Sequence, residues 1–228
     1  MTSSANPIRV LLADDQELVR LGFRMILDAE DDIMVVGEAS NGEEATTFVT
    51  GTETDIILMD VRMPVVDGIE ATRRIVSSHP DSRIVILTTF DLDQYAFAAL
   101  RAGASGFLLK GCTPHELISA IRAVAAGDAA ISSRVTRSML ELFATRLPDS
   151  DATSSRPEND PTDVLTPRER DVFLAIAEGL TNSEISDRFF LTESTVKTHV
   201  GRVLAKLELR DRVHAVIFAY EHDLIARS

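Results

Sequence analysis

The chain has 228 residues, enough for one or two domains, and its apolar fraction of 45% is ordinary for globular proteins. The single cysteine, Cys112, excludes an intramolecular disulfide framework and fits a reducing compartment, so we expect a cytoplasmic protein. The net charge of −13 argues against indiscriminate nucleic-acid binding, and no apolar run is long enough for a membrane helix.

The first part of the chain alternates short apolar runs with helical patterns. The runs expected to form β-strands are Ile8–Ala13, Met34–Ala39, Ile56–Met59, Ile84–Leu87 and Gly106–Leu109. Helices are expected over Glu17–Asp28, from Asn41, over Ile69–Ser77, from Asp91 to Arg101 and from Thr113 to Ala126. Strict alternation of this kind predicts a doubly wound α/β fold with a parallel sheet and right-handed crossovers.

Polar side chains stand where four of these strands end. Asp14 and Asp15 follow the first strand, Asp60 follows the third, Thr88 the fourth and Lys110 the fifth. The carboxyl ends of parallel strands meet at one edge of an open sheet, where ligands bind. Taken singly, each residue has a structural explanation, such as a helix-capping acid or a solvated loop lysine. As a set they predict a site that holds a divalent cation and a phosphoryl group.

A linker is expected between this part and the last segment of the chain. Another helix is predicted over Ser133–Thr145, followed by Leu147–Asp163, which is rich in Pro, Ser and Asp and almost free of apolar residues. Such a segment cannot bury a core and reads as a flexible connection. Residues 164–228 carry 9 Lys and Arg against 10 Asp and Glu, so the acidity belongs to the front of the chain and the linker.

The last segment is expected to contain four helices. They begin near Thr166, Thr181, Thr192 and Val213, and the second and third are joined by about three residues. The third has an apolar stripe of Val196, Val200, Val203, Leu204 and Leu207. Its opposite face is small or basic, with Ser194, Lys197, Thr198, Gly201, Arg202 and Ala205. A helix-turn-helix explains this pattern, and an ordinary helical bundle with a solvated face explains the periodicity equally well.

Longer motifs connect the two parts to known families. Residues 8–126 resemble the receiver domain of two-component response regulators, through ADD ending at Asp15, LMDVRMPVVDG at Leu58–Gly68, Thr88 and Lys110. Residues 164–222 resemble the LuxR-type helix-turn-helix, through LTPRERDVF, GLTNSEI and TVKTHVGRVLAKL. Together they resemble the NarL/FixJ family of bacterial transcriptional regulators. The resemblance implies a receiver domain over 1–130 with strand order 2-1-3-4-5, a linker helix and flexible linker over 131–163, and an all-α four-helix DNA-binding domain over 164–228.

The resemblance implies a role for each receiver residue. Asp60 would accept a phosphoryl group from a sensor histidine kinase. Mg²⁺ would be held by Asp15, Asp60 and the Arg62 backbone carbonyl, with Asp14 acting largely through water. Lys110 and Thr88 would bind phosphoryl oxygens. Phe107 stands where the family keeps an aromatic switch residue that follows Thr88, although an aromatic residue in an apolar strand is equally explained by packing.

The LuxR-type resemblance implies that the chain binds double-stranded operator DNA as a homodimer when phosphorylated. The candidate DNA-binding residues are Thr195, Lys197, Thr198, Gly201, Arg202, Lys206 and Arg210. Several relatives carry a basic residue at the position of Gly201, so base reading is expected from Lys197 and Thr198, with Arg202, Lys206 and Arg210 nearer phosphates. The stripe Val213, Val216, Ile217 and Tyr220 is either a dimer contact or the closure of the bundle.

Two other functions would also use part of this site. A phosphohydrolase of the haloacid-dehalogenase type would also use Asp60 as nucleophile, but such enzymes carry a second acid where this chain has Arg62. A scaffold that acts by protein contact alone would be favoured if a site acid were missing. Both explanations leave the LuxR-type segment unexplained. We therefore do not expect an enzyme, apart from phosphotransfer to Asp60 and self-dephosphorylation.

Overall fold

The computed structural model describes residues 6–89, 98–126, 160–222 and 224. The chain divides into two compact units, Met1–Ile131 and Ser132–Ser228. Among the described residues, no helix combines the length and the apolar character needed to cross a bilayer.

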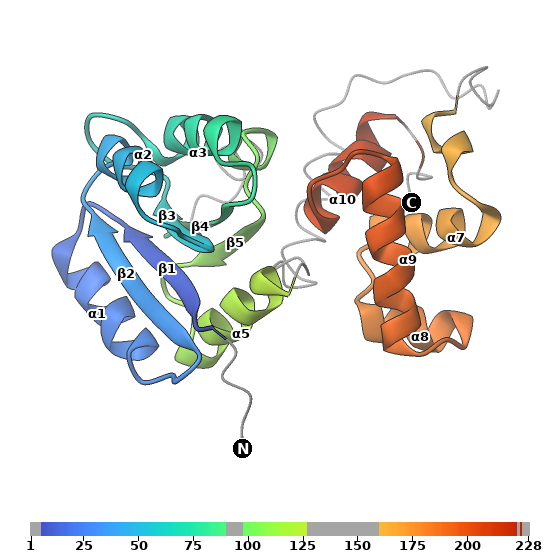
Figure 1. The fold of residues 1–228 in the computed structure, drawn as a ribbon, viewed down its shortest axis with the longest axis horizontal. Coiled ribbons are helices and arrows are strands. Elements are labelled where there is room, and N and C mark those ends of the chain that lie inside the picture. The colour runs from blue at the N-terminus through green and yellow to red at the C-terminus, as the bar shows by residue number, and fades with distance from the viewer. Residues whose placement is uncertain (1–5, 90–97, 127–159, 223, 225–228) are drawn as a thin grey trace. The chain divides into compact units, whose positions relative to one another are not determined.

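The first unit is built on a five-stranded parallel sheet. Its strands are β1 (Ile8–Ala13), β2 (Ile33–Ala39), β3 (Ile56–Asp60), β4 (Arg83–Thr88) and β5 (Gly106–Leu109). The strand order is β2-β1-β3-β4-β5, and every neighbouring pair is parallel (Figure 1). The predicted fold class and strand order are confirmed.

Helices cover both faces of this sheet. They are α1 (Glu17–Leu27), α2 (Gly42–Gly51), α3 (Gly68–Ser78) and α5 (Pro114–Ala125). Figure 1 shows α1 and α5 against one face and α2 and α3 against the other. Residues 98–101 are helical, and the remainder of the helix predicted from Asp91 lies outside the described residues. Phe23, Leu27, Leu117 and Ile121 pack with alternate strand residues to form the core on the α1 and α5 side.

Several apolar residues that recur at helical spacing in α1 are exposed instead of buried. Leu18, Leu21 and Met25 recur at helical spacing, yet they are 82%, 51% and 69% exposed. Phe23 and Leu27 enter the core instead. The period of 3.6 residues therefore predicted the helix correctly, but of the apolar residues at this spacing Ile26 packs against the core while Leu18, Leu21 and Met25 face outward.

The second unit is a small helical bundle. It contains a short 3-10 helix, η1 (Pro161–Val164), followed by α7 (Pro167–Ala177), α8 (Asn182–Phe189), α9 (Glu193–Lys206) and α10 (Arg212–Glu221). Its core includes Phe173, Ile176, Val196 and Val203, all fully buried. Threonine N-caps with glutamate at the third helical position form complete capping boxes at α7 and α8, as their sequences predict.

The end of the predicted linker is ordered. Asp160 is 5% exposed, and its carboxylate accepts hydrogen bonds from Thr162 and from Arg170 of α7. The expectation of a flexible segment up to Asp163 is therefore wrong for residues 160–163, because the buried Asp160 carboxylate binds Arg170 of α7. The predicted helix Ser133–Thr145 and residues 147–159 lie outside the described part of the chain.

Candidate functional site

The register of the sheet brings the polar strand ends together. Ala13 pairs with Met59, so Asp14 comes next to Asp60 at the same edge. Asp60 pairs with Leu87, and Thr88 pairs with Leu109, the residue before Lys110. Because all the strands are parallel, their final residues cannot avoid meeting at this edge.

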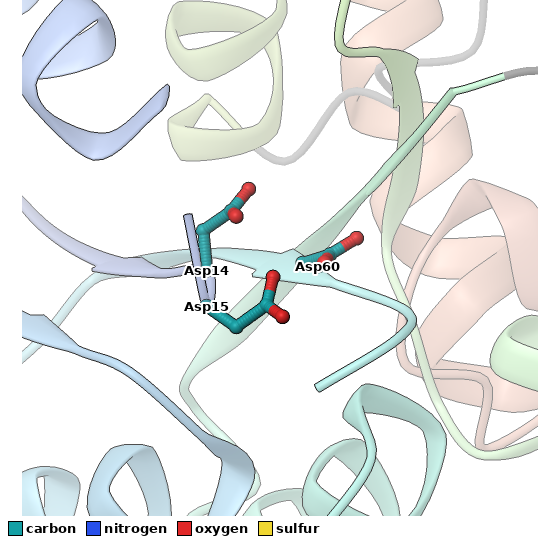
Figure 2. A group of neighbouring side chains, drawn as sticks. All are labelled: Asp14, Asp15 and Asp60. Carbon is teal, nitrogen blue, oxygen red and sulfur yellow. The ribbon is translucent and has the colours of Figure 1, made fainter. Parts of the chain in front are cut away.

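Three carboxylates gather at this edge. Asp14, Asp15 and Asp60 each offer an oxygen, and these oxygens lie within 4.8 Å of one another. Figure 2 shows the side chains at the ends of β1 and β3, with the Asp15 carboxylate turned toward Asp60. Asp14 and Asp60 are 1% and 5% exposed, whereas Asp15 is open to solvent. The cluster has a buried floor and an accessible rim.

Lys110 balances part of this negative charge. Its Nζ lies 2.7 Å from Asp14 Oδ2 and 3.1 Å from Asp60 Oδ2, and its side chain is only 9% exposed. Three carboxylates and one ammonium leave two negative charges uncompensated when all four groups are ionised. A divalent cation bound by oxygen ligands would neutralise that excess.

The environment of Asp60 opposes its ionisation. Burial raises the pKa of the Asp60 carboxyl above its usual value, and the neighbouring Asp14 charge adds to the rise. The Lys110 ammonium and a hydrogen bond from the Arg62 backbone N–H partly offset it by stabilising the carboxylate. A positive charge beside Asp60 would favour the ionised form that a nucleophile requires.

The residues present fit a hard cation such as Mg²⁺. Asp14 Oδ2 is buried and, although paired with Lys110, accepts no hydrogen bond of regular geometry from the described residues. Asp15 makes no side-chain hydrogen bond or ion pair there either, so its oxygens keep their coordinating capacity. The structure places the Arg62 N–H against Asp60, and the role of the Arg62 carbonyl as a ligand stays a prediction.

The two candidate switch residues lie on neighbouring strands. Thr88 is the last residue of β4 and is 7% exposed, and its carbonyl accepts a hydrogen bond from the Lys110 N–H at 2.7 Å. Phe107 pairs with Ile86 on β4 and is 1% exposed. Register places Thr88 and Phe107 on the same face of the sheet, where a change at one can reach the other. The full burial of Phe107 agrees equally with a packing role.

Gly68, which the sequence analysis did not place in the site, fixes the loop after Asp60. Gly68 begins α3 and donates a hydrogen bond to the Val61 carbonyl at 2.9 Å. A Cβ at this position would lie 1.9 Å from the Asp60 carbonyl oxygen. Only a residue without a side chain allows α3 to begin so close to the end of β3. The signal was available, since Gly68 ends the LMDVRMPVVDG motif.

We expect Gly68→Ala to destabilise the first unit by about 1–3 kcal/mol, because the new methyl group meets backbone atoms that cannot move independently. Chemical unfolding would measure the loss. Gly22→Ala is the matched control, since nothing lies within 4 Å of its Cβ position inside α1; it should gain about 1 kcal/mol. Equal stability of Gly68→Ala and the wild type would show that the loop accommodates a side chain.

The second unit presents a helix pair with a short turn. Phe190, Leu191 and Thr192 connect α8 to α9, and Phe190 ends α8 in the left-handed conformation with φ 53°. Phe190 is 95% exposed, so the turn directs a large aromatic side chain into solvent at a position that usually favours glycine. This connection gives α8 and α9 the predicted helix-turn-helix arrangement.

The two faces of α9 separate as its sequence predicts. Val196, Val200 and Val203 are buried in the bundle core. The residues of the small and basic face are all exposed: Ser194, Lys197, Thr198, Gly201, Arg202 and Ala205. Thr195 is half-buried, and its backbone N–H is capped by Thr192. The exposed face of α9 therefore carries only small or basic side chains, which suits the major groove.

Lys206 has a partner inside the protein. Its Nζ lies 2.6 Å from Glu169 Oε2, and the Glu169 side chain is 5% exposed. The same carboxylate accepts a hydrogen bond from the Thr166 N–H at the start of α7. To contact a phosphate, Lys206 would have to leave a buried acid. Arg202 forms no ion pair with any described residue, and its side chain is the better candidate for a phosphate contact.

This ion pair predicts an acid-sensitive link between α7 and α9. Lys206, together with the Thr166 N–H, lowers the pKa of Glu169 to about 2. A lowered pKa in the folded state adds stability above the usual pKa of glutamate, and this stability is lost as the pH falls toward about 2. In Lys206→Met, the free energy of unfolding of the second unit should depend less on pH in this acid range. Unfolding of that unit can be followed by nuclear magnetic resonance. Arg188→Met, which breaks the exposed Arg188–Glu178 pair, should leave this pH dependence unchanged.

The candidate dimer stripe on α10 is turned inward. Val213, Val216 and Ile217 are 2%, 9% and 7% exposed, and Val216 belongs to the core of the bundle. Tyr220 is half-buried and packs against that core. The structure therefore favours closure of the bundle, the other explanation of this stripe.

Sequence comparisons agree with both parts of this description. Residues 10–122 match the response regulator receiver domain, and residues 163–219 match the luxR family of bacterial regulatory proteins. The fold and the two sites thus define a regulator that joins a receiver domain to a DNA-binding domain.

The relatives extend over nearly the whole chain. The transcriptional regulatory proteins YxjL and LiaR of Bacillus subtilis (strain 168) are 44% and 40% identical, cover 96% of this chain, and are covered over 97% and 99% of their own lengths. The crystal structure of the response regulator ChrA from a heme-sensing two-component system is 33% identical, with a TM-score of 0.52 and coverage of 97% and 100% of the two chains. This chain belongs to the family of two-component response regulators with a LuxR-type DNA-binding domain.

Membership of this family distinguishes a response regulator from a phosphohydrolase and from a scaffold. A receiver domain implies a histidine kinase as partner, and the luxR-family domain implies DNA as ligand. The chain is therefore a transcription regulator rather than a catalytic enzyme.

Proposed function

We propose that a sensor histidine kinase phosphorylates this response regulator on Asp60, and that phosphorylation promotes dimerisation and sequence-specific binding to double-stranded operator DNA in the cytoplasm. The observation that carries the proposal is the position of the Asp60 carboxylate, buried, 3.1 Å from Lys110 and beside two further acids. Carboxylates held in this way serve as nucleophiles toward phosphoryl groups.

In the proposed transfer, an Asp60 oxygen attacks the phosphorus of a phosphohistidine. The new O–P bond forms as the N–P bond breaks, and the imidazole of the kinase takes the electron pair. Lys110 holds one phosphoryl oxygen, and the Thr88 hydroxyl holds another. Asp14, Asp15, Asp60 and the Arg62 carbonyl are the candidate ligands of Mg²⁺, which would neutralise charge at the phosphoryl group when bound.

The phosphorylated state is proposed to be transient. The acyl phosphate on Asp60 loses its phosphoryl group to water, which restores the carboxylate and releases phosphate. Asp15 at the exposed rim leaves the site open to that water. Phe107 is proposed to follow Thr88 when the Thr88 hydroxyl turns toward the phosphoryl group. The burial of Phe107 fits both this switch role and a role in packing alone.

The two units are proposed to have separate roles, one as the receiver and the other in DNA binding. Residues 1–130 act as the receiver, and the linker begins at 131. The DNA-binding domain was expected from 164 and is better begun at Asp160, which is fastened to α7. Lys197 and Thr198 are proposed to read bases, with Thr195 and Gly201 close to the groove and Arg202 as the main phosphate contact. Arg210 and Lys206 are proposed as secondary phosphate contacts.

The proposal is tested on the full chain with Mg²⁺ and a small phosphodonor. We expect analytical ultracentrifugation to show a shift from the 24.9 kDa monomer toward a dimer, together with tighter operator binding. A dimer presents two sets of phosphate contacts to two half-sites, which strengthens binding. Asp60→Asn is the control and should show neither change. Identical mass and DNA affinity with and without phosphodonor would contradict the proposal.

A further inference from the structure

An arginine on α1 reaches the loop that carries two of the three site acids. Arg20 Nη1 donates a hydrogen bond to the backbone carbonyl oxygen of Asp14 at 2.6 Å, and Arg20 Nε donates to Glu38 Oε2 at 3.0 Å. The Arg20 side chain is 14% exposed. Glu38 lies on β2, so the guanidinium spans from the second strand to the end of the first.

Asp14 is held at every polar group. Its N–H donates to the Ala39 carbonyl, its Oδ1 accepts from the Gln16 N–H, and its Oδ2 pairs with Lys110. Arg20 holds its carbonyl oxygen, the remaining polar atom. Since a peptide unit is planar, fixing this oxygen also fixes the N–H of Asp15 and the direction in which the chain enters Asp15.

Asp15 depends on this fixed peptide. It is exposed, and its carboxylate has no hydrogen bond or ion pair with the described residues. No side-chain partner directs the Asp15 carboxylate toward Asp60 (Figure 2), so its direction must come from the backbone. Among the described residues, Arg20 is the one whose side chain bonds to the peptide between Asp14 and Asp15.

We propose that Arg20 is a positioning residue for the cation site: by holding the Asp14–Asp15 peptide, it prearranges the Asp15 carboxylate for Mg²⁺. This inference rests on the proposed function, which makes Asp15 a ligand. Groups that orient the ligands of a metal typically change its affinity about 10- to 100-fold when they are removed.

Simple electrostatics predicts the opposite sign. Arg20 carries a positive charge close to Asp14, and its removal should let a divalent cation bind more tightly. A positioning role predicts weaker binding after the same change. The direction of the effect therefore separates the two explanations.

The neighbouring Arg24 supplies a matched control. Arg24 Nε donates to Glu38 Oε1 at 2.6 Å, so it shares the acidic partner of Arg20 on the same helix. Its described contacts do not include Asp14. Arg20→Met and Arg24→Met each remove one cation and one ion pair to Glu38, and only Arg20→Met releases the Asp14–Asp15 peptide.

The test is Mg²⁺ titration of the full chain by isothermal calorimetry, with amide hydrogen exchange of Asp15 measured in metal-free protein. We expect Arg20→Met to bind Mg²⁺ about 10- to 100-fold more weakly and to exchange the Asp15 amide faster. Arg24→Met should match or exceed the wild-type affinity. Arg20→Lys keeps the charge but not the guanidinium that binds two acceptors at once, so it should also bind Mg²⁺ more weakly. It replaces Arg20→Met as the test variant if Arg20→Met does not fold.

Unchanged or tighter Mg²⁺ binding by the Arg20 variants would overturn the inference, as would an equal loss in Arg24→Met. If the wild type itself binds no Mg²⁺, the proposed function fails instead. A normal wild type with unaffected Arg20 variants would leave that function intact and remove only the role of Arg20.

Discussion

Asp60→Asn is expected to abolish uptake of a phosphoryl group by the full chain. Asparagine keeps the shape of aspartate but replaces the nucleophilic oxygen with an amide, which cannot form an acyl phosphate. The wild type should take up one phosphoryl group that hydroxylamine removes, as expected of an acyl phosphate. Incorporation from a phosphodonor with Mg²⁺, measured by intact mass, tests this prediction. Uptake by Asp60→Asn at the wild-type level would end the assignment.

Asp15→Asn should lose most uptake together with its dependence on Mg²⁺. Asp15 is the exposed member of the acid cluster and has no other described partner, so its substitution removes cation affinity without breaking a buried ion pair. Asp81→Asn is the control, because Asp81 is an equally exposed acid at the other end of the sheet, two residues before the start of β4. If both variants keep normal Mg²⁺ dependence, Asp15 is not a ligand.

Asp60→Asn carries a second expectation about stability in metal-free solution. Burial and Asp14 raise the pKa of Asp60, so folding favours the neutral group. For an acid with a raised folded-state pKa, the stabilising contribution is present at low pH and is lost as the pH rises through that pKa. The neutral amide should therefore increase the unfolding temperature of the first unit at neutral pH. A lower unfolding temperature would show that the pairing of Asp60 with Lys110 outweighs its burial.

Lys197→Ala is expected to remove most of the preference for operator over random DNA. Lys197 is exposed and lies one turn into α9, beside the buried stripe of Val196 and Val200. Residues near the start of a recognition helix reach base edges, and a lysine bound to guanine contributes about 1–3 kcal/mol of discrimination. Binding to matched operator and random duplexes, measured at several salt concentrations, would show the loss.

Arg202→Ala is the matched control for Lys197→Ala. Arg202 is also exposed on α9, but it lies further from the start of the helix. It should weaken binding to both duplexes alike and reduce the salt slope by about 1, as the loss of one phosphate contact does. Lys206 is unsuitable for this purpose, because its substitution also breaks the pair with Glu169. If Lys197→Ala weakens both duplexes equally, base reading must lie with Thr198 or with DNA shape.

The receiver site could be predicted because it depends on chain order. Asp14, Asp15, Asp60, Thr88 and Lys110 each end or follow an apolar run, and alternation with helices makes the strands parallel. Parallel strands place their carboxyl ends at one edge, so neighbours in space follow from positions in the sequence. The helix starts could also be predicted, because each depends on a few adjacent residues. Threonine, proline and glutamate cap α5 and α7 within four residues.

Contacts between distant elements could not be read in this way. Glu169 and Lys206 are 37 residues apart, and neither spacing nor charge pattern marks them as partners. Arg20 and Asp14 are near in sequence, but the same guanidinium also binds Glu38 on a third element, which the sequence does not mark as its partner. Long side chains have many rotamers, and only the packed structure selects one.

The sequence by itself determined the strands and α-helices of the described residues, the parallel sheet, the acid cluster and the exposed basic face of α9. For α1 and α10, tertiary structure decided which apolar residues become core. Leu18, Leu21 and Met25 face outward from α1, whereas Val213, Val216 and Ile217 are buried on α10. Periodicity gives the spacing of an apolar stripe but not the element that packs against it. The neighbouring elements settle that choice, because they bury the face that packs against them without voids.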